Sequence, residues 1–224
     1  MPGRAAPRRA SPEEPDLPPS LTDATPASLA AGDEWQESRI AGIDLSGVAA
    51  RGVRVTECEL IGVVATGAQL DLLSMKDVLL TDCELSGAGL GKASLRRTEL
   101  RNCRVAGLVL SDAQLHDVRF VACKLDGANF RFAQITQVVF EGCSLVDADF
   151  GGATFDAVTF DHCDLRDSDF SQASAESTRL HGSVVDGLRG ASGLGGVTID
   201  TMQVMPLALG VFAELGIRID DSEA

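Results

Sequence analysis

The sequence predicts an all-β solenoid built from five-residue units, and three observations support this fold class. Every fifth residue from Leu45 to Val185 is apolar, a run of 29 positions in a chain that is 45% hydrophobic. Five cysteines recur at every twentieth position, so four units form a larger repeat. A period of five fits neither the turn of an α-helix nor the alternation of a flat strand, and it indicates a repeat architecture.

Residues 1–36 are predicted to form a disordered, proline-rich tail. Seven of the eight prolines lie between Pro2 and Pro26, mixed with Ala, Ser, Asp and Glu. Such a composition buries too little apolar area to offset the entropy of ordering the chain. Trp35, at the end of this tail, is placed to cover the first exposed edge of the repeat.

The sequence also bears on the cellular compartment. Arg8 and Arg9 are followed by the acidic, proline-rich stretch 11–19 instead of an apolar segment, so we expect no signal peptide. No stretch approaches ~18 consecutive apolar residues, so we expect no transmembrane helix. We therefore expect a cytoplasmic protein whose cysteines are reduced thiols.

Residues 37–190 are predicted to form the solenoid, with two of every five side chains pointing inward. A second column of small or apolar residues lies two positions before the first in each unit. When every twentieth residue is compared, this column separates by residue type, which indicates that equivalent residues stack in successive coils at the ~4.8 Å spacing of β-strands. One set is a predicted core ladder of Cys83, Cys103, Cys123, Cys143 and Cys163.

We interpret the cysteine ladder as core packing. A metal or redox site needs thiols that converge on one point, whereas these are one predicted coil apart and all point inward. Free cysteine behaves as a small hydrophobic residue. We therefore predict no metal site and no cofactor.

No catalytic residue is predicted. The three histidines, His116, His162 and His181, fall on outward positions, and none lies in an HxxxH or HExxH arrangement. Residues 161–163 read Asp-His-Cys, but His162 points outward and Cys163 points inward. The outward side chains vary regularly, and no insertion is large enough to wall a cleft. We therefore expect that the protein is not an enzyme.

Two segments, 128–132 (ANFRF) and 148–152 (ADFGG), resemble the A(D/N)LXX unit of the pentapeptide-repeat family. The resemblance covers two thirds of the chain, from Ile43 to Leu188. It implies a right-handed parallel β-helix of quadrilateral cross-section, with one pentapeptide on each side and about seven coils. It says little about function, because the repeat is a scaffold on which function varies.

Residues 191–224 are predicted to form a small cap of strand, helix and strand over the open end of the solenoid, where unpaired backbone groups would otherwise be exposed. The strands are expected at 197–199 and 217–219, and Asp200 or Thr201 is expected to cap the helix between them. The helix has more apolar residues than one face needs, and family members with an apolar C-terminal helix form dimers. The predicted homodimer contact is Leu207, Val211, Phe212 and Leu215.

Charge is high and uneven along the chain. A formal net charge of −14 argues against direct nucleic-acid binding and against anionic membranes. Residues 91–131 contain eight basic and four acidic side chains, whereas residues 136–170 contain eight acidic side chains and one basic. The candidate basic surface is Arg96, Arg97, Arg101, Arg104, Lys124 and Arg131. The candidate acidic, partner-binding surface is Glu141, Asp147, Asp156, Asp161 and Asp167.

The predicted function is a non-catalytic scaffold for protein–protein interaction, with a protein partner of unknown identity. The alternative is narrower: the resemblance implies that some family members mimic duplex DNA, bind DNA gyrase, and inhibit it or protect it from quinolones. The acidic coils favour this alternative, and the basic coils before them argue against it. Two further interpretations stay open: the acidic face is merely solvated, or rods associate side by side through oppositely charged coils.

Overall fold

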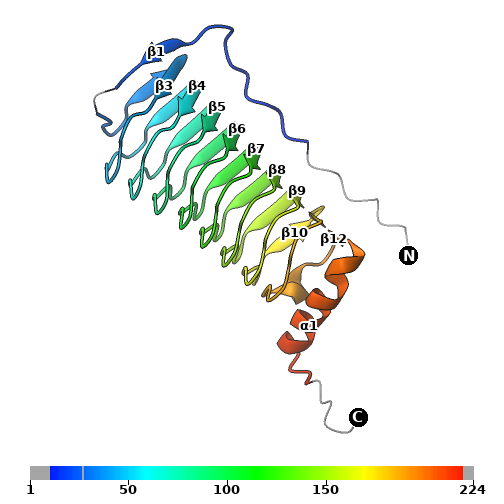
Figure 1. Ribbon diagram of the computed structural model, residues 1–224. Coiled ribbons are helices and arrows are strands. Elements are labelled where there is room, and N and C mark those ends of the chain that lie inside the picture. Colours follow the sequence, from blue (N-terminus) through cyan, green and yellow to red (C-terminus); the bar gives the residue numbers. More distant parts are fainter. Residues whose placement is uncertain (1–10, 27, 219–224) are drawn as a thin grey trace.

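Parallel strands form a solenoid along most of the chain. The computed structural model describes residues 11–26 and 28–218, and its strands belong to one 12-stranded sheet that winds through about nine turns (Figure 1). The predicted pentapeptide solenoid is confirmed, with a coil count nearer nine than seven. The count differs because strands at both ends continue the stacking beyond the region of regular apolar spacing.

The strands follow one another with nearly constant spacing. In chain order they are β1 (Thr22–Ala24), β2 (Glu34–Gln36), β3 (Ser38–Ala41), β4 (Arg54–Ile61), β5 (Ser74–Thr81), β6 (Ser94–Arg101), β7 (Gln114–Val121), β8 (Gln134–Glu141), β9 (Thr154–Asp161), β10 (Ser174–Glu176), β11 (Arg179–His181) and β12 (Thr198–Ile199). The helical elements of the described residues are the 3-10 helices η1 (Ala191–Gly193) and η2 (Thr201–Gln203), and the α-helix α1 (Val204–Glu214).

Successive coils are in register, so that each residue pairs with the twentieth residue after it. Phe120 of β7 pairs with Phe140 of β8, and Phe140 pairs with Phe160 of β9. Each side of a coil ends at a corner residue with positive φ, two positions after an inward residue, as at Gly142 (φ 60°) and Asp147 (φ 56°). Glycine, asparagine and aspartate tolerate this left-handed conformation best, which explains why they recur at the corners.

Like side chains fill like positions in the core. The rings of Phe120, Phe140 and Phe160 are stacked, with centroids 4.9 and 4.8 Å apart. A second stack of Phe130 and Phe150, 4.8 Å apart, meets the first edge to face. All five rings are fully buried, and both arrangements are favoured by the charge distribution of aromatic rings.

The structure places all five cysteines of the ladder in the core, buried and free. The thiol of Cys143 donates to the carbonyl of Phe120 at 3.3 Å, and Cys163 donates to the carbonyl of Phe140 at 3.4 Å. The neighbouring Cys123 thiol, together with burial, raises the pKa of Cys103 to about 12. Cys103 therefore stays protonated at neutral pH, as expected of a packing residue and not of a nucleophile.

The described part of the N-terminal tail follows a defined path, and the predicted disorder of residues 1–36 stays a prediction. Residues 11–26 run along the outside of the solenoid (Figure 1), and β1 pairs with β3. Prolines favour an extended backbone, and three amides of this segment donate to outward side chains of the solenoid. Trp35 in β2 packs on the core at this end. Residues 1–10 lie outside the described residues.

The C-terminal segment continues the sheet and then forms α1 beside the last coil. β12 pairs with β11, and the Asp200 carboxylate caps η2 by accepting from the Met202 amide at 3.0 Å. The expected strand at 217–219 does not form at Ile217, because its amide bonds to the Phe212 carbonyl at 2.8 Å and not to a neighbouring strand. Residue 219 lies outside the described residues.

Phe140→Ala is expected to lower the free energy of unfolding by about 3–5 kcal/mol, because the ring is fully buried between two stacked neighbours and its removal leaves a cavity. Glu141→Ala removes an exposed side chain and is expected to cost less than about 1 kcal/mol. Denaturant titration of the two variants measures both values. Equally mild effects would contradict the assignment of inward and outward positions.

Candidate partner-binding surfaces

The charge of one surface column of side chains changes from positive to negative along the solenoid. Strand register stacks its members, one from each of β5 to β9. Four are exposed and Thr136 is half-buried. We call this column the first stripe: Lys76, Arg96, His116, Thr136 and Asp156.

A second stripe, on another side of the solenoid, has the same polarity. Successive parallel bridges join its members, Arg104, Lys124, Ser144 and Asp164. Arg166 donates to Asp164 at 2.6 Å and lowers the pKa of that carboxyl group. The acidic end of the second stripe is therefore neutralised within the chain. Asp156, at the acidic end of the first stripe, forms no ion pair with the described residues.

The structure divides the predicted basic surface into paired and unpaired residues. The paired arginines are Arg97 with Asp77 (2.6 Å), Arg101 with Glu99 (2.6 Å) and Arg131 with Asp149 (3.1 Å). Arg96, Arg104 and Lys124 are exposed and form no ion pair within the described part of the chain. Of the six predicted basic residues, the three without an ion pair therefore all lie in the two stripes.

The predicted acidic residues lie on different sides and do not form one patch. Glu141 and Asp161 are register partners at the ends of β8 and β9, and Arg119 reaches Glu141 at 3.2 Å. Asp147 and Asp167 are corner residues one coil apart. Adjacent carboxylates destabilise a sheet, so an opposite charge on a partner would relieve both pairs.

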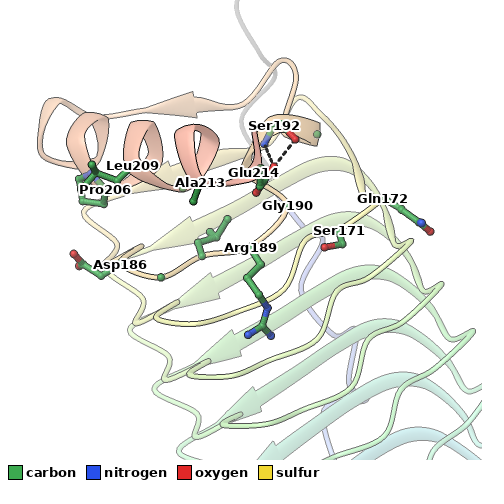
Figure 2. Close-up of a pocket in the computed structure, with 14 residues that line it drawn as sticks. Ser171, Gln172, Asp186, Arg189, Gly190, Ser192, Pro206, Leu209, Ala213 and Glu214 are labelled. Carbon is green, nitrogen blue, oxygen red and sulfur yellow. Dashed lines mark hydrogen bonds between the residues drawn. The ribbon is translucent and has the colours of Figure 1, made fainter. Parts of the chain in front are cut away.

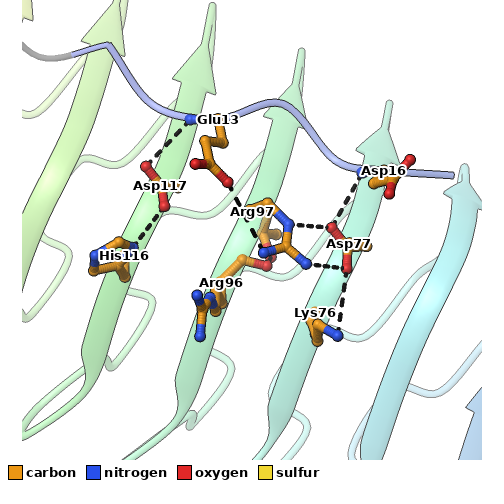
Figure 3. Close-up of polar contacts among 9 residues, drawn as sticks. Glu13, Asp16, Lys76, Asp77, Arg96, Arg97, His116 and Asp117 are labelled. Atoms are coloured by element: carbon orange, nitrogen blue, oxygen red, sulfur yellow. Dashed lines mark hydrogen bonds and ion pairs between the residues drawn. The ribbon is translucent and has the colours of Figure 1, made fainter.

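The tail contributes an element that sequence reasoning missed, which we call the strap (residues 11–17). The strap crosses the coils along one corner (Figure 3). Its amides donate to side chains of a single corner column. These bonds are Ser11 to Gln137 Oε1 (3.1 Å), Glu13 to Asp117 Oδ1 (3.2 Å) and Asp16 to Asp77 Oδ1 (3.1 Å).

Asp77 is the most enclosed acceptor beneath the strap, with 2% of its surface exposed. Burial alone would raise its pKa, but hydrogen bonds from the Arg97 guanidinium and the Asp16 amide outweigh burial and lower the pKa. A lowered carboxyl pKa stabilises the folded state above the unfolded value of about 3.9. This contribution is lost as the pH falls through the folded value.

A groove of about 730 Å³ lies between the last coil and α1 (Figure 2). The Glu214 carboxylate in this groove accepts from the amides of Ala191 and Ser192 at 2.8 and 3.1 Å, and from the Ser192 hydroxyl. These hydrogen bonds, led by those from Ser192, lower the pKa of Glu214. The side chain therefore stays charged and fastens the end of α1 to η1.

No residue of α1 is buried. Of the predicted dimer contact, Leu207 packs against the core, Val211 is half-buried, and Phe212 and Leu215 are exposed. Exposed apolar residues of this segment outside that prediction include Met202, Val204, Met205, Leu209 and Ile217. The helix α1 has 11 residues. Within the described part of the chain, no helix is long and apolar enough to cross a lipid bilayer.

The coils, corners and stacked columns define a pentapeptide-repeat protein. A family model described as a pentapeptide repeat region matches residues 73–150 and 113–189, which together cover just over half of the chain. The chain belongs to the pentapeptide-repeat family.

Solved structures with a similar fold include QnrB1 and HetL. Full-length QnrB1, a plasmid-mediated fluoroquinolone resistance protein, is 17% identical over 88% of this chain and 100% of that chain, with a TM-score of 0.40. HetL, a pentapeptide repeat protein involved in heterocyst differentiation regulation from the cyanobacterium Nostoc sp. strain PCC 7120, is 18% identical over 75% of this chain and 87% of that chain, with a TM-score of 0.33. No curated protein sequence matches the chain.

Removal of the strap's acceptors in an Asp77→Ala/Asp117→Ala variant is expected to speed hydrogen exchange at the amides of Glu13 and Asp16 by roughly tenfold, because each loses its hydrogen bond. Hydrogen–deuterium exchange measured by mass spectrometry on peptides covering the strap checks this. Asp147→Ala/Asp167→Ala removes two corner carboxylates elsewhere and should leave the strap unchanged. Equal exchange in both variants would show that these bonds do not hold the strap.

Proposed function

We propose that this protein is a non-catalytic scaffold that binds a protein partner along the first stripe. Pentapeptide-repeat proteins are in general structural or interaction proteins. The supporting observation is the in-register column that runs from Lys76 and Arg96 to Asp156. Arg96 and Asp156 form no ion pair with other described residues, so their charges are available to a partner. A surface that is basic at one end and acidic at the other fits a partner of opposite polarity.

Charge complementarity of this kind selects a partner and its orientation. Exposed charges speed association and discriminate against wrong partners more than they add affinity. A reversed partner would place like charges opposite each other at both ends of the stripe. The second stripe supports binding less well, because Arg166 already neutralises its Asp164.

The alternative function is binding to DNA gyrase as a DNA mimic. The pairs Glu141 with Asp161 and Asp147 with Asp167 support it, since each places carboxylates in adjacent coils. Exposed Arg96, Arg104 and Lys124 in the preceding coils oppose it, because they interrupt the negative charge that a duplex presents along its length. The scaffold is therefore our first proposal.

Homodimerisation is a separate part of the proposal. The side chains of Phe212 and Leu215, and those of Met202, Met205 and Leu209 earlier in the same segment, leave apolar area in solvent at the C-terminal end. Burial of this area against the same helix of a second copy would remove it from water. The two long rods would then extend from a central contact.

Charge reversal in the first stripe is expected to abolish capture of the partner from a cell extract of the source organism. The variant is Lys76→Glu/Arg96→Glu, and the matched control is Arg104→Glu/Lys124→Glu in the second stripe, with the same change in net charge. Mass spectrometry compares the proteins retained by each immobilised variant. Equal retention by both variants would place the partner elsewhere.

The gyrase alternative has its own test. It expects that the protein inhibits supercoiling by DNA gyrase, and that this inhibition weakens when Asp156, Asp161 and Asp167 are changed to asparagine.

A dimer formed through α1 is expected to persist at both low and high salt, because apolar contacts are not screened. Sedimentation velocity measures the oligomeric state. Leu209→Glu/Phe212→Glu is expected to give monomers, and Arg96→Glu to leave dimers intact. Association that disappears at high salt and in Arg96→Glu would instead support pairing of rods through their charged stripes.

A further inference from the structure

Three side chains capable of binding a metal ion gather at the last coils of the solenoid. Asp161 ends β9, His162 is the corner residue that follows, and His181 ends β11. The register of β9 and β11 places His181 beside Asp161, one coil away. One potential ligand atom from each of the three residues lies within 4.8 Å of the other two.

The surrounding backbone holds these side chains together. Gly182, the corner one coil after His162, has φ 60°, and a Cβ there would lie 2.8 Å from the His162 ring. Glycine therefore leaves the space that the imidazole occupies. The Gly182 amide donates to Asp200 at 2.8 Å, which fixes this corner to the start of the C-terminal cap.

The side chains are already oriented toward one another. The Nδ1 atom of His162 is 2.9 Å from Asp161 Oδ1, and the rings of His162 and His181 are perpendicular with centroids 5.5 Å apart. Ligand atoms of a tetrahedral zinc site lie about 3.4 Å apart, given bonds of about 2.1 Å. Both histidines are exposed, so small side-chain rotations can bring the three ligand atoms to that separation.

We propose that Asp161, His162 and His181 form a surface site for a divalent transition-metal ion, with Zn²⁺ as the reference ion. Two imidazoles and one carboxylate are the donors that Zn²⁺, Ni²⁺ and Cu²⁺ prefer, whereas Ca²⁺ and Mg²⁺ prefer all-oxygen sites. Glu141, the register partner of Asp161, adds negative charge one coil away. The open positions of the ion would face solvent and accept water or a side chain of a partner.

This site would join two adjacent coils near the C-terminal end of the solenoid. Asp161 and His162 belong to one coil and His181 to the next, which precedes β12. An ion that binds only the folded arrangement stabilises it by mass action. Zinc should therefore raise the melting temperature, in addition to binding directly.

Isothermal titration of the full chain with ZnCl₂ at pH 7.5, in a buffer with a non-thiol reductant, is expected to give one ion per chain. His162→Asn/His181→Asn should weaken binding at least tenfold and remove the rise in melting temperature. Asparagine suits the left-handed corner at position 162, so this variant should fold. His116→Asn is the matched control. His116 also contacts an aspartate, Asp117, but it belongs to no cluster of three potential metal ligands within the described part of the chain.

Acidification gives an independent test. Protons compete with a metal ion for the imidazole nitrogens, so affinity should fall when the titration is repeated at lower pH. Absence of binding at millimolar zinc, or equal binding by wild type and the His162→Asn/His181→Asn variant, would overturn the proposal. Loss of binding in His116→Asn alone would assign the ion to a different place.

Discussion

A corner every five residues is the constraint on which this solenoid depends. The corner backbone is left-handed, which costs roughly 1–2 kcal/mol for a residue with a Cβ, and parallel hydrogen bonds between coils offset that cost. Bulky corner residues need space in the next coil. Phe132 (φ 58°) is followed one coil later by Gly152, where a Cβ would lie 2.6 Å from the ring. His162 stands over Gly182 in the same way.

Register then decides which neighbours each side chain has, both inside and outside. In the core this is favourable, because stacked phenylalanines and cysteines fill identical spaces in successive coils. On the surface it places Asp147 above Asp167 and Glu141 beside Asp161, where like charges repel. The corner column of Asp77, Arg97 and Asp117 alternates in sign instead, and it is this column that binds the strap.

The sequence predicts the core and the register well, because a solenoid places its contacts at a fixed separation along the chain. The same arithmetic places His181 beside Asp161, since His181 is the twentieth residue after it. That cluster was missed because the histidines were compared with helical metal motifs such as HxxxH and not with the period of the solenoid. The strap was not predictable in this way. Its contacts, such as that of Asp16 with Asp77, join residues 61 apart, a separation that no repeat encodes.

The strap and the first stripe occupy neighbouring positions, so a partner on the stripe would also meet the tail. Arg96 of the stripe precedes Arg97, which holds Asp77 and lies 4.0 Å from the strap's Glu13. Figure 3 shows the strap's acidic side chains beside the basic end of the stripe. Negative charge there partly offsets the positive charge of Lys76 and Arg96 at long range. If the first stripe binds a partner as proposed, movement of the strap would change the electrostatic potential of the stripe without any change in the coils, and would alter partner affinity in that way.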